Sequence, residues 1–235
     1  DGNDIINSGG GTDTLDGGLG DETYAFTDGW GDATIVDTLG TNTIDMSAVT
    51  APLTFDFSAD TVTDTTNNVD YSGGSIANFI GGTQADTFTF GAGDVVSGTL
   101  DGGLGDDALD FSAFAGAIDV VLTALNTAGF DGTISSGGSL ITSFANMVAL
   151  TADVGFTNTI TGMNTASTWD VDAGEYVTGG DTFTYTNFAE IYGGSDVDTF
   201  NLDNNATVNI AGGAGADTLA ISGTAVLTGD RKSVV

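Results

Sequence analysis

The side chains that can do chemistry in this sequence are almost all carboxylates, and many of them stand in glycine-rich turns. The chain carries 33 acidic residues against two basic ones, has no His and no Cys, and has a formal net charge of −31. Carboxylate and backbone carbonyl oxygens are the ligands that Ca²⁺ prefers. The absence of His and Cys excludes the usual nucleophilic triads and zinc sites. The acidic surface also repels nucleic-acid phosphates, which excludes nucleic acid as a partner.

The glycine-rich turns follow a nonapeptide pattern, Gly-Gly-x-Gly-x-Asp-x-apolar-x. It fits in full at 102–110 and 212–220, with near matches at 8–16, 17–25, 81–89 and 193–201. Glycine allows turns with φ > 0 and leaves backbone carbonyls accessible, because it has no Cβ. The Asp that follows can reach the same ion with its carboxylate. The pattern therefore indicates calcium-binding turns.

This nonapeptide resembles the repeat of the RTX (haemolysin-type calcium-binding) family, and the later part of the chain resembles the β-helical regions of large bacterial adhesins. The resemblance implies Ca²⁺ ions between turns that stack on one edge of a β-roll. It implies that Asp4 faces the turn 17–22 and that Asp13 faces the turn 29–32. The candidate metal ligands are Asp4, Gly9, Gly11, Asp13, Gly17, Gly18, Gly20, Glu22, Asp32, Asp86, Gly102, Gly103, Gly105, Asp107, Asp198, Gly212, Gly213, Gly215 and Asp217.

The same turns also have an interpretation without a metal ion. Asp and Gly are ordinary turn residues, and an Asp carboxylate can accept hydrogen bonds from the backbone N–H groups of its turn. Where Asp precedes Thr, as in Asp86-Thr87, the Asp is expected to begin a strand and the Thr to point outward. Both interpretations remain open from the sequence.

A looser repeat of about 20 residues predicts the elements that carry these turns. Its strings begin with an acid or Asn, continue with Thr or Ala, and then alternate apolar and other residues. They occur at 22–26, 42–46, 86–90, 107–111, 181–185, 198–202 and 217–221. Such alternation is typical of a half-buried strand. Each unit is one coil of strand, glycine turn, strand and loop, and it buries its inward side chains by stacking on its neighbours.

The predicted fold is all-β: a right-handed parallel β-solenoid. An RTX nonapeptide β-roll is expected over 1–37, continuing over 38–229 as an irregular parallel β-helix of roughly 20-residue coils. Residues 51–76 and 112–157 lack the regular spacing and are expected to hold longer loops, with a short helix or a looser excursion over 111–125. The expected inward column, with each member touching the next coil, is Phe88, Leu109, Phe183, Phe200 and Leu219.

Both ends of the sequence carry expectations of their own. The sequence opens inside a repeat, so flanking repeats of the same longer chain are expected as neighbours. Both basic residues, Arg231 and Lys232, stand among the last five positions, and residues 230–235 are expected to be a non-native tail. The sequence contains no run of 18 or more apolar residues, so it predicts no transmembrane helix, and no signal peptide is visible.

Together these features predict a non-catalytic, calcium-binding repeat segment of a secreted or cell-surface bacterial protein. It would act as an adhesin stalk that folds on extracellular Ca²⁺, with surface glycans or a host or neighbouring cell as partners. Two alternatives are a carbohydrate-active or carbohydrate-binding β-helix module of an exported polysaccharide-modifying enzyme, and the repeat region of an RTX toxin. Catalysis is disfavoured because paired acids such as Asp170 and Asp172 lack the basic residue that sugar-cleaving sites generally contain.

Overall fold

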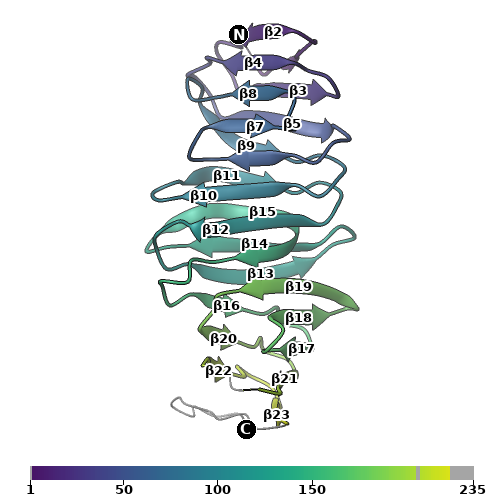
Figure 1. Ribbon diagram of the computed structural model, residues 1–235, viewed down its shortest axis with the longest axis vertical. Coiled ribbons are helices and arrows are strands. Elements are labelled where there is room, and N and C mark those ends of the chain that lie inside the picture. The colour runs from purple at the N-terminus through teal and green to yellow at the C-terminus, as the bar shows by residue number, and fades with distance from the viewer. Residues whose placement is uncertain (1, 205–206, 223–235) are drawn as a thin grey trace.

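The computed structural model describes residues 2–204 and 207–222, and every regular element in these residues is a β-strand. The strands stack one above the other in a tall column that begins with β2 and β4 and ends with β21 and β23 (Figure 1). The fold is therefore all-β, as predicted. The helix considered over 111–125 is wrong, because β12 and β13 occupy most of that segment. In the described residues, no helix is long and apolar enough to cross a membrane.

Strand pairing divides the column into two faces that share one strand, β15 (Ser139–Thr151). In stacking order, face A consists of β1 (Ile5–Asn7), β3 (Thr23–Thr27), β5 (Asn42–Ala48), β9 (Ile76–Ile80), β11 (Val96–Asp101), β15, β14 (Phe130–Ser135), β13 (Asp119–Leu125), β16 (Thr159–Thr161), β20 (Glu190–Tyr192) and β22 (Asn209–Ala211).

Face B consists, in the same direction, of β2 (Thr12–Leu15), β4 (Asp32–Ile35), β8 (Asn68–Asp70), β7 (Thr61–Thr63), β6 (Thr54–Asp56), β10 (Thr87–Gly91), β12 (Asp107–Ala113), β15, β19 (Asp181–Thr186), β18 (Glu175–Thr178), β17 (Ser167–Asp170), β21 (Asp198–Leu202) and β23 (Thr218–Ile221). The first part of β15 pairs with β11 of face A and its last part with β12 of face B. Between them Asn146 has a φ of 59°, a left-handed conformation that Asn tolerates.

Most neighbouring strands pair in parallel, as the sequence predicts, but three antiparallel meanders interrupt the series. The meanders are β6–β7–β8, β13–β14–β15 and β17–β18–β19. The first two lie in 51–76 and 112–157, where the sequence predicts only longer loops, and the third is not anticipated. Each meander adds two strands to one face without adding any to the other, and the repeat spacing is lost there for that reason.

The inward side chains of face B form a column with more members than the sequence predicts. Strand register pairs Phe88 with Leu109 and Phe200 with Leu219, as expected. The expected contacts of Phe183 with Leu109 and with Phe200 are wrong. Strand β15 lies between β12 and β19, and β18 and β17 of the third meander lie between β19 and β21. In that interval the column runs through Leu150, Tyr185, Phe183, Tyr176 and Trp169.

The aromatic rings of successive coils give the first testable prediction. The Phe90 ring is fully buried and stacks between Phe57 and Phe111, with centroid distances of 4.4 and 4.2 Å. Phe90→Ala leaves a cavity inside this stack, and we expect it to lower the free energy of unfolding by about 3–5 kcal/mol in a urea titration. The control Val154→Ala removes an apolar side chain that is 81% exposed, and it should change stability by less than about 0.5 kcal/mol. Equal losses in the two variants would contradict the packing described.

Candidate cation-binding turns

The turns between the two faces line up along two edges of the column. Turns that lead from face A to face B form the A-to-B edge, at 8–11, 28–31, 49–53, 81–86, 102–106, 162–166, 193–197 and 212–217. Turns that lead back form the B-to-A edge, at 16–22, 36–41, 71–75, 92–95, 114–118, 152–158 and 187–189. The four nonapeptide turns after residue 80 in the described residues, at 81–86, 102–106, 193–197 and 212–217, all lie on the A-to-B edge. Each of these turns therefore finds its stacking partner in a neighbouring coil.

The turn that contains Asp4 lies on the B-to-A edge, against the turn 17–22. The Gly2 N–H donates a hydrogen bond to the carbonyl oxygen of Leu19 (2.9 Å), and the N–H of Thr23 donates to the carbonyl oxygen of Asp4 (2.9 Å). The Asp4 side chain itself is exposed. The structure thus brings Asp4 beside the candidate residues Gly17, Gly18, Gly20 and Glu22.

The candidates Gly9, Gly11 and Asp13 lie on the opposite, A-to-B edge. The N–H of Asp32 donates to the carbonyl oxygen of Gly11 (2.7 Å), so the two turns stack as the sequence predicts. The Asp13 carboxylate accepts a hydrogen bond from Ser8 Oγ (3.3 Å), and Asp32 is exposed. These acids remain largely in contact with solvent. This pair of turns therefore has fewer buried carboxylate oxygens than the turns of the B-to-A edge.

Glu22 is the most unusual acid of the B-to-A edge. Its side chain is 1% exposed, yet both carboxylate oxygens lack a hydrogen-bond partner. The buried Asp37 lies beside it, and its Oδ2 accepts hydrogen bonds from Tyr24 Oη (2.6 Å) and Gly17 N (3.2 Å). A Cβ at Gly17 would collide with the Glu22 side chain and lie 3.1 Å from Asp37 Oδ2. Glycine at this position therefore creates the space in which the two carboxylates meet.

The electrostatics of this pair are unbalanced. Burial raises the pKa of Glu22, and the neighbouring acids Asp37, Asp4 and Asp21 raise it further. Burial also acts to raise the pKa of Asp37. The hydrogen bonds from Tyr24, from the backbone and from the Glu22 carboxyl when it is protonated outweigh burial, and they hold the pKa of Asp37 below its usual value. Asp37 keeps its charge, and Glu22 is left to take up either a proton or a cation.

A backbone carbonyl completes this oxygen-rich cradle. A Cβ at Gly20, which has a φ of 135°, would collide with the carbonyl oxygen of Gly2 and lie 2.7 Å from Glu22 Oε1. The cradle therefore offers the Glu22 and Asp37 carboxylates together with the carbonyl of Gly2. This combination of carboxylate and carbonyl oxygens fits a hard cation such as Ca²⁺.

On the A-to-B edge, the motif acids accept hydrogen bonds from backbone N–H groups, some in their own turn and some in a neighbouring coil. Asp86 accepts hydrogen bonds from Leu53 N (2.7 Å) and Gly82 N (2.6 Å), and Asp107 Oδ1 accepts one from Asp86 N (2.8 Å). The turn 102–106, with the candidates Gly102, Gly103 and Gly105, stacks on the turn 81–86 through a hydrogen bond from Leu104 N to Gly82 O (3.0 Å). This is the hydrogen-bonded role that the sequence left open.

The last two motif turns repeat this arrangement. Asp217 Oδ1 accepts a hydrogen bond from Asp198 N (3.1 Å), and Asp198 Oδ2 accepts one from Gly194 N (2.8 Å). The turn of Gly212, Gly213 and Gly215 stacks on the turn 193–197 through a hydrogen bond from Ala214 N to Gly194 O (3.1 Å). Five of the strand strings thus begin with an acid or Asn whose side chain accepts a hydrogen bond from another coil: Asn42, Asp86, Asp107, Asp198 and Asp217.

One carboxylate oxygen of Asp107 takes no part in these hydrogen bonds. Asp107 is fully buried, and its Oδ2 has no hydrogen-bond partner. Burial raises its pKa to about 7, and the charges of Asp86, Asp101 and Asp106 add to the effect. Burial likewise raises the pKa of Asp86 to about 6, against the hydrogen bonds from Gly82 and Leu53. An unpartnered buried carboxylate oxygen is satisfied either by a proton or by a cation.

Side chains alone do not assemble a metal centre. Within residues 2–204 and 207–222, no three acidic side chains converge in the manner of a metal-binding cluster. An ion at these turns would have to take several of its oxygens from backbone carbonyls and water. Asp37 is the functional candidate that the sequence analysis missed. Its signal was its position 20 residues after Gly17, one coil further along the same edge.

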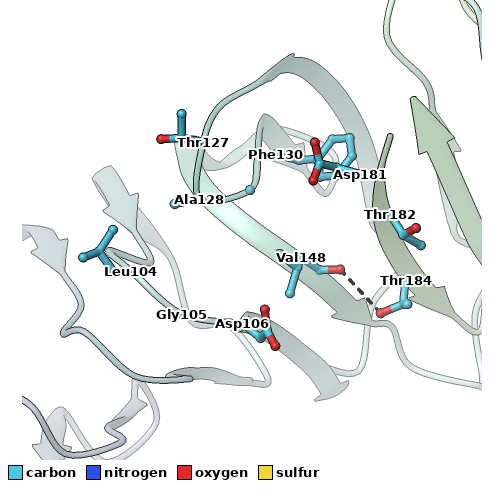
Figure 2. A pocket seen from close by; sticks show the side chains of 11 residues that line it. Leu104, Gly105, Asp106, Thr127, Ala128, Phe130, Val148, Asp181, Thr182 and Thr184 are labelled. Atoms are coloured by element: carbon cyan, nitrogen blue, oxygen red, sulfur yellow. Dashed lines mark hydrogen bonds between the residues drawn. The ribbon is translucent and has the colours of Figure 1, made fainter. Parts of the chain in front are cut away.

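A groove of about 620 Å³ opens on the A-to-B edge beside β15 (Figure 2). Strand β15 rounds this edge without a protruding turn, so a gap remains between the turn 104–106, the loop 127–130 and the start of β19. Thr184 Oγ1 donates a hydrogen bond to the carbonyl oxygen of Val148 across its floor (3.4 Å). The groove offers carboxylates and hydroxyls from Asp106, Asp181, Thr127, Thr182 and Thr184.

Comparison with known proteins adds no identification. The chain matches no protein-family model, no curated protein and no solved structure.

The burial of Asp107 predicts how stability changes with pH in a calcium-free buffer. Its pKa is 3.8 without the folded environment and about 7 in the folded chain, so between these values the folded state binds the extra proton. The stabilisation is complete below pH 4 and is lost as the pH rises through 7. In urea titrations, the parent should have a lower free energy of unfolding at pH 8 than at pH 5. In Asp107→Asn, this difference between the two pH values should be smaller by more than about 1 kcal/mol.

Two features of that experiment make its outcome clear. Asn keeps the oxygen that accepts the Asp86 N–H, so only the charge is removed. Asp181→Asn removes one charge from an exposed side chain and should leave the pH dependence as it is in the parent. If Asp107→Asn and Asp181→Asn behave alike, Asp107 does not carry the proton.

Proposed function

We propose that this chain is a non-catalytic, calcium-binding repeat segment of RTX type from a secreted or cell-surface bacterial protein. Its coils run in a right-handed solenoid, with a β-roll over 1–37 that continues as an irregular β-helix over 38–229. It serves as a stiff stalk or surface element, and Ca²⁺ stabilises its turns. The tail at 230–235 lies outside the described residues.

The buried, unpartnered carboxylate of Glu22 is the observation that carries this proposal. A carboxylate without hydrogen bonds is costly to bury unless a positive charge or a proton compensates it. Lys and Arg occur only at Lys232 and Arg231, and His does not occur, so no basic side chain in the described residues can pair with it. The adjacent Asp37 carboxylate and Gly2 carbonyl favour a hard, oxygen-seeking cation as the compensating group.

The residues of the turn each contribute to such a site. Glu22 and Asp37 supply charge, Gly2 supplies a carbonyl oxygen, and Gly17 and Gly20 keep side chains out of the space. A bound Ca²⁺ would supply the positive charge that these carboxylates lack. Because turns of successive coils contribute to one cradle, an ion there would hold the first coils of the column together.

The mechanical part of the proposal rests on the shape and the composition. The strands form one continuous column (Figure 1). Its buried aromatic and aliphatic core runs from Tyr24 to Leu202, and partly buried apolar residues of the end coils, such as Ile6 and Leu219, pack against it. A column that buries its core only between neighbouring coils suits a spacer, since each coil transmits load to the next. The absence of Cys and the large acidic excess suit a chain stabilised by extracellular calcium instead of disulfides.

A calcium titration tests the proposal. Chelator-treated protein should gain β-structure by far-UV circular dichroism, or gain thermal stability, at high-micromolar to millimolar Ca²⁺ and not with Mg²⁺. At a Ca²⁺ concentration 100 times the dissociation constant, the gain in stability should be about 2.7 kcal/mol per site. Glu22→Gln should abolish one site in calorimetric binding, whereas Glu175→Gln, which removes the same charge elsewhere, should bind as the parent does. A chain that is fully folded in chelator and insensitive to Ca²⁺ would refute the proposal.

The groove beside β15 favours a second candidate function, the binding of a carbohydrate. Its carboxylates and threonine hydroxyls can exchange hydrogen bonds with sugar hydroxyls, and Leu104 and Val148 offer apolar contact to the sugar ring. We infer this function only for the groove, and it is compatible with a calcium-stabilised stalk.

Affinity electrophoresis in gels that contain neutral or acidic polysaccharides tests this second candidate. A neutral polysaccharide should retard the parent protein. Thr182→Trp, which fills the groove, should remove the retardation, whereas Thr34→Trp on the exposed side of β4 should not. Identical mobility of the parent with and without polysaccharide would eliminate this function.

A further inference from the structure

A second cavity, of about 290 Å³, lies on the B-to-A edge, outside the glycine-rich turns. It is formed where the first meander returns to face A. The residues after β6, the end of the β7–β8 hairpin, β9 and the loop before β11 surround it. Its lining combines aromatic, apolar and acidic side chains: Phe57, Ser58, Asp60, Tyr71, Ile76, Phe79, Asp94, Val95 and Val96.

The hydroxyl of Tyr71 is the unexplained group of this cavity. Tyr71 is 6% exposed, and its hydroxyl oxygen is buried without a hydrogen-bond partner. Burial raises the pKa of this phenol, and the nearby charges of Asp60, Asp56 and Asp94 raise it further. The hydroxyl is therefore neutral, and Tyr71, Asp60 and Asp94 all line the cavity. Buried tyrosine hydroxyls normally find a partner, so a missing ligand is indicated.

Two carboxylates in the lining also retain unused acceptor capacity. No N–H or O–H group of the described residues donates to the Asp60 carboxylate, and burial together with Asp94, Asp70 and Asp56 raises its pKa. Only the Oδ2 atom of Asp94 is used. It accepts hydrogen bonds from Ser58 Oγ and from Gly91 N, each with a donor–acceptor distance of 2.7 Å. A cationic donor would relieve the repulsion between the acids and use their free oxygens.

The walls of the cavity select the size and the shape of that donor. Phe57 and Tyr71 pack against Phe79 with centroid distances of 5.0 and 5.3 Å, and these three rings form a firm aromatic wall. Val95 is 61% exposed beside the cavity, and Ile76 completes the apolar side. Aromatic rings attract cations, and an apolar rim accommodates an alkyl stem.

We propose that this cavity binds a primary alkylammonium group, the chemistry of a lysine side chain. Such a group has three N–H donors and no acceptor. Its three partners are the Asp60 carboxylate, the free oxygen of Asp94 and the hydroxyl of Tyr71. The alkyl stem passes over Val95 and Ile76 to the outside.

A bare metal ion fits this cavity less well than an ammonium group does. The acids here do not converge as a metal-binding cluster would, a statement that holds for the described residues as a whole. The cavity is also close to the lower end of ligand-pocket volumes, about 300 Å³, which suits a side chain and exceeds the needs of an ion. This site is independent of the calcium site at Glu22, and either can exist without the other.

Isothermal titration calorimetry of the full chain with n-butylammonium chloride tests the proposal, in about 0.15 M NaCl to screen non-specific attraction. The parent should show one saturable site. Asp60→Asn removes the charge while Asn keeps the left-handed backbone of this position (φ 53°), and it should weaken binding by about tenfold or more. Tyr71→Phe deletes only the hydroxyl and should weaken binding by about three- to tenfold.

A charge-matched control variant, a second amine and competition with Ca²⁺ complete the experiment. Asp119→Asn removes one exposed charge on β13 and should bind n-butylammonium as the parent does. N-acetyl-lysine N-methylamide extends the stem with a peptide backbone. If it binds as well as n-butylammonium, a protein-borne lysine can enter, and if it does not bind, the site takes free amines only. Three outcomes would overturn the proposal. The parent would show no saturable binding, Asp60→Asn would bind the amine as tightly as the parent does, or millimolar Ca²⁺ would displace the amine and occupy the same number of sites.

Discussion

Backbone pairing is the constraint on which the rest of this molecule depends, because it holds neighbouring strands about 4.8 Å apart. A sequence that places an acid in each turn then places carboxylate above carboxylate. At that separation two charges repel by about 3 kcal/mol at an effective dielectric of 20. The surroundings of these carboxylates differ along the chain. Asp86 and Asp107 accept hydrogen bonds from backbone N–H groups and have raised pKa values, whereas the two carboxylate oxygens of Glu22 have no hydrogen-bond partner.

The groove beside β15 and the cavity with Tyr71 both lie where the repeat is broken. Strand β15 rounds the A-to-B edge as a continuous strand, and the groove opens beside it. The meander β6–β7–β8 carries the residues that enclose the smaller cavity with Tyr71. These two irregular segments therefore give the column room for a ligand larger than an ion.

Several elements could be predicted from residues alone, and their limits have a physical cause. The alternation of 86–90 and 107–111 predicts β10 and β12, and the register of Phe88 with Leu109 follows from one shared motif. The same logic fails between Leu109 and Phe183, because a strand added by an antiparallel hairpin leaves no spacing signal. The buried position of Glu22 beside Asp37 also escapes the motif, since Asp37 belongs to a different coil.

The sequence by itself determined the all-β stacking of this protein, its glycine turns and its surplus of carboxylates. These properties follow from local alternation, from the conformational freedom of glycine and from composition. Only the tertiary structure decided which acids are buried and what they meet, since their contacts between coils join residues 13 to 33 positions apart. Gly17 and Asp37, or Asp60 and Asp94, become neighbours through the stacking of coils, and no local pattern contains that information.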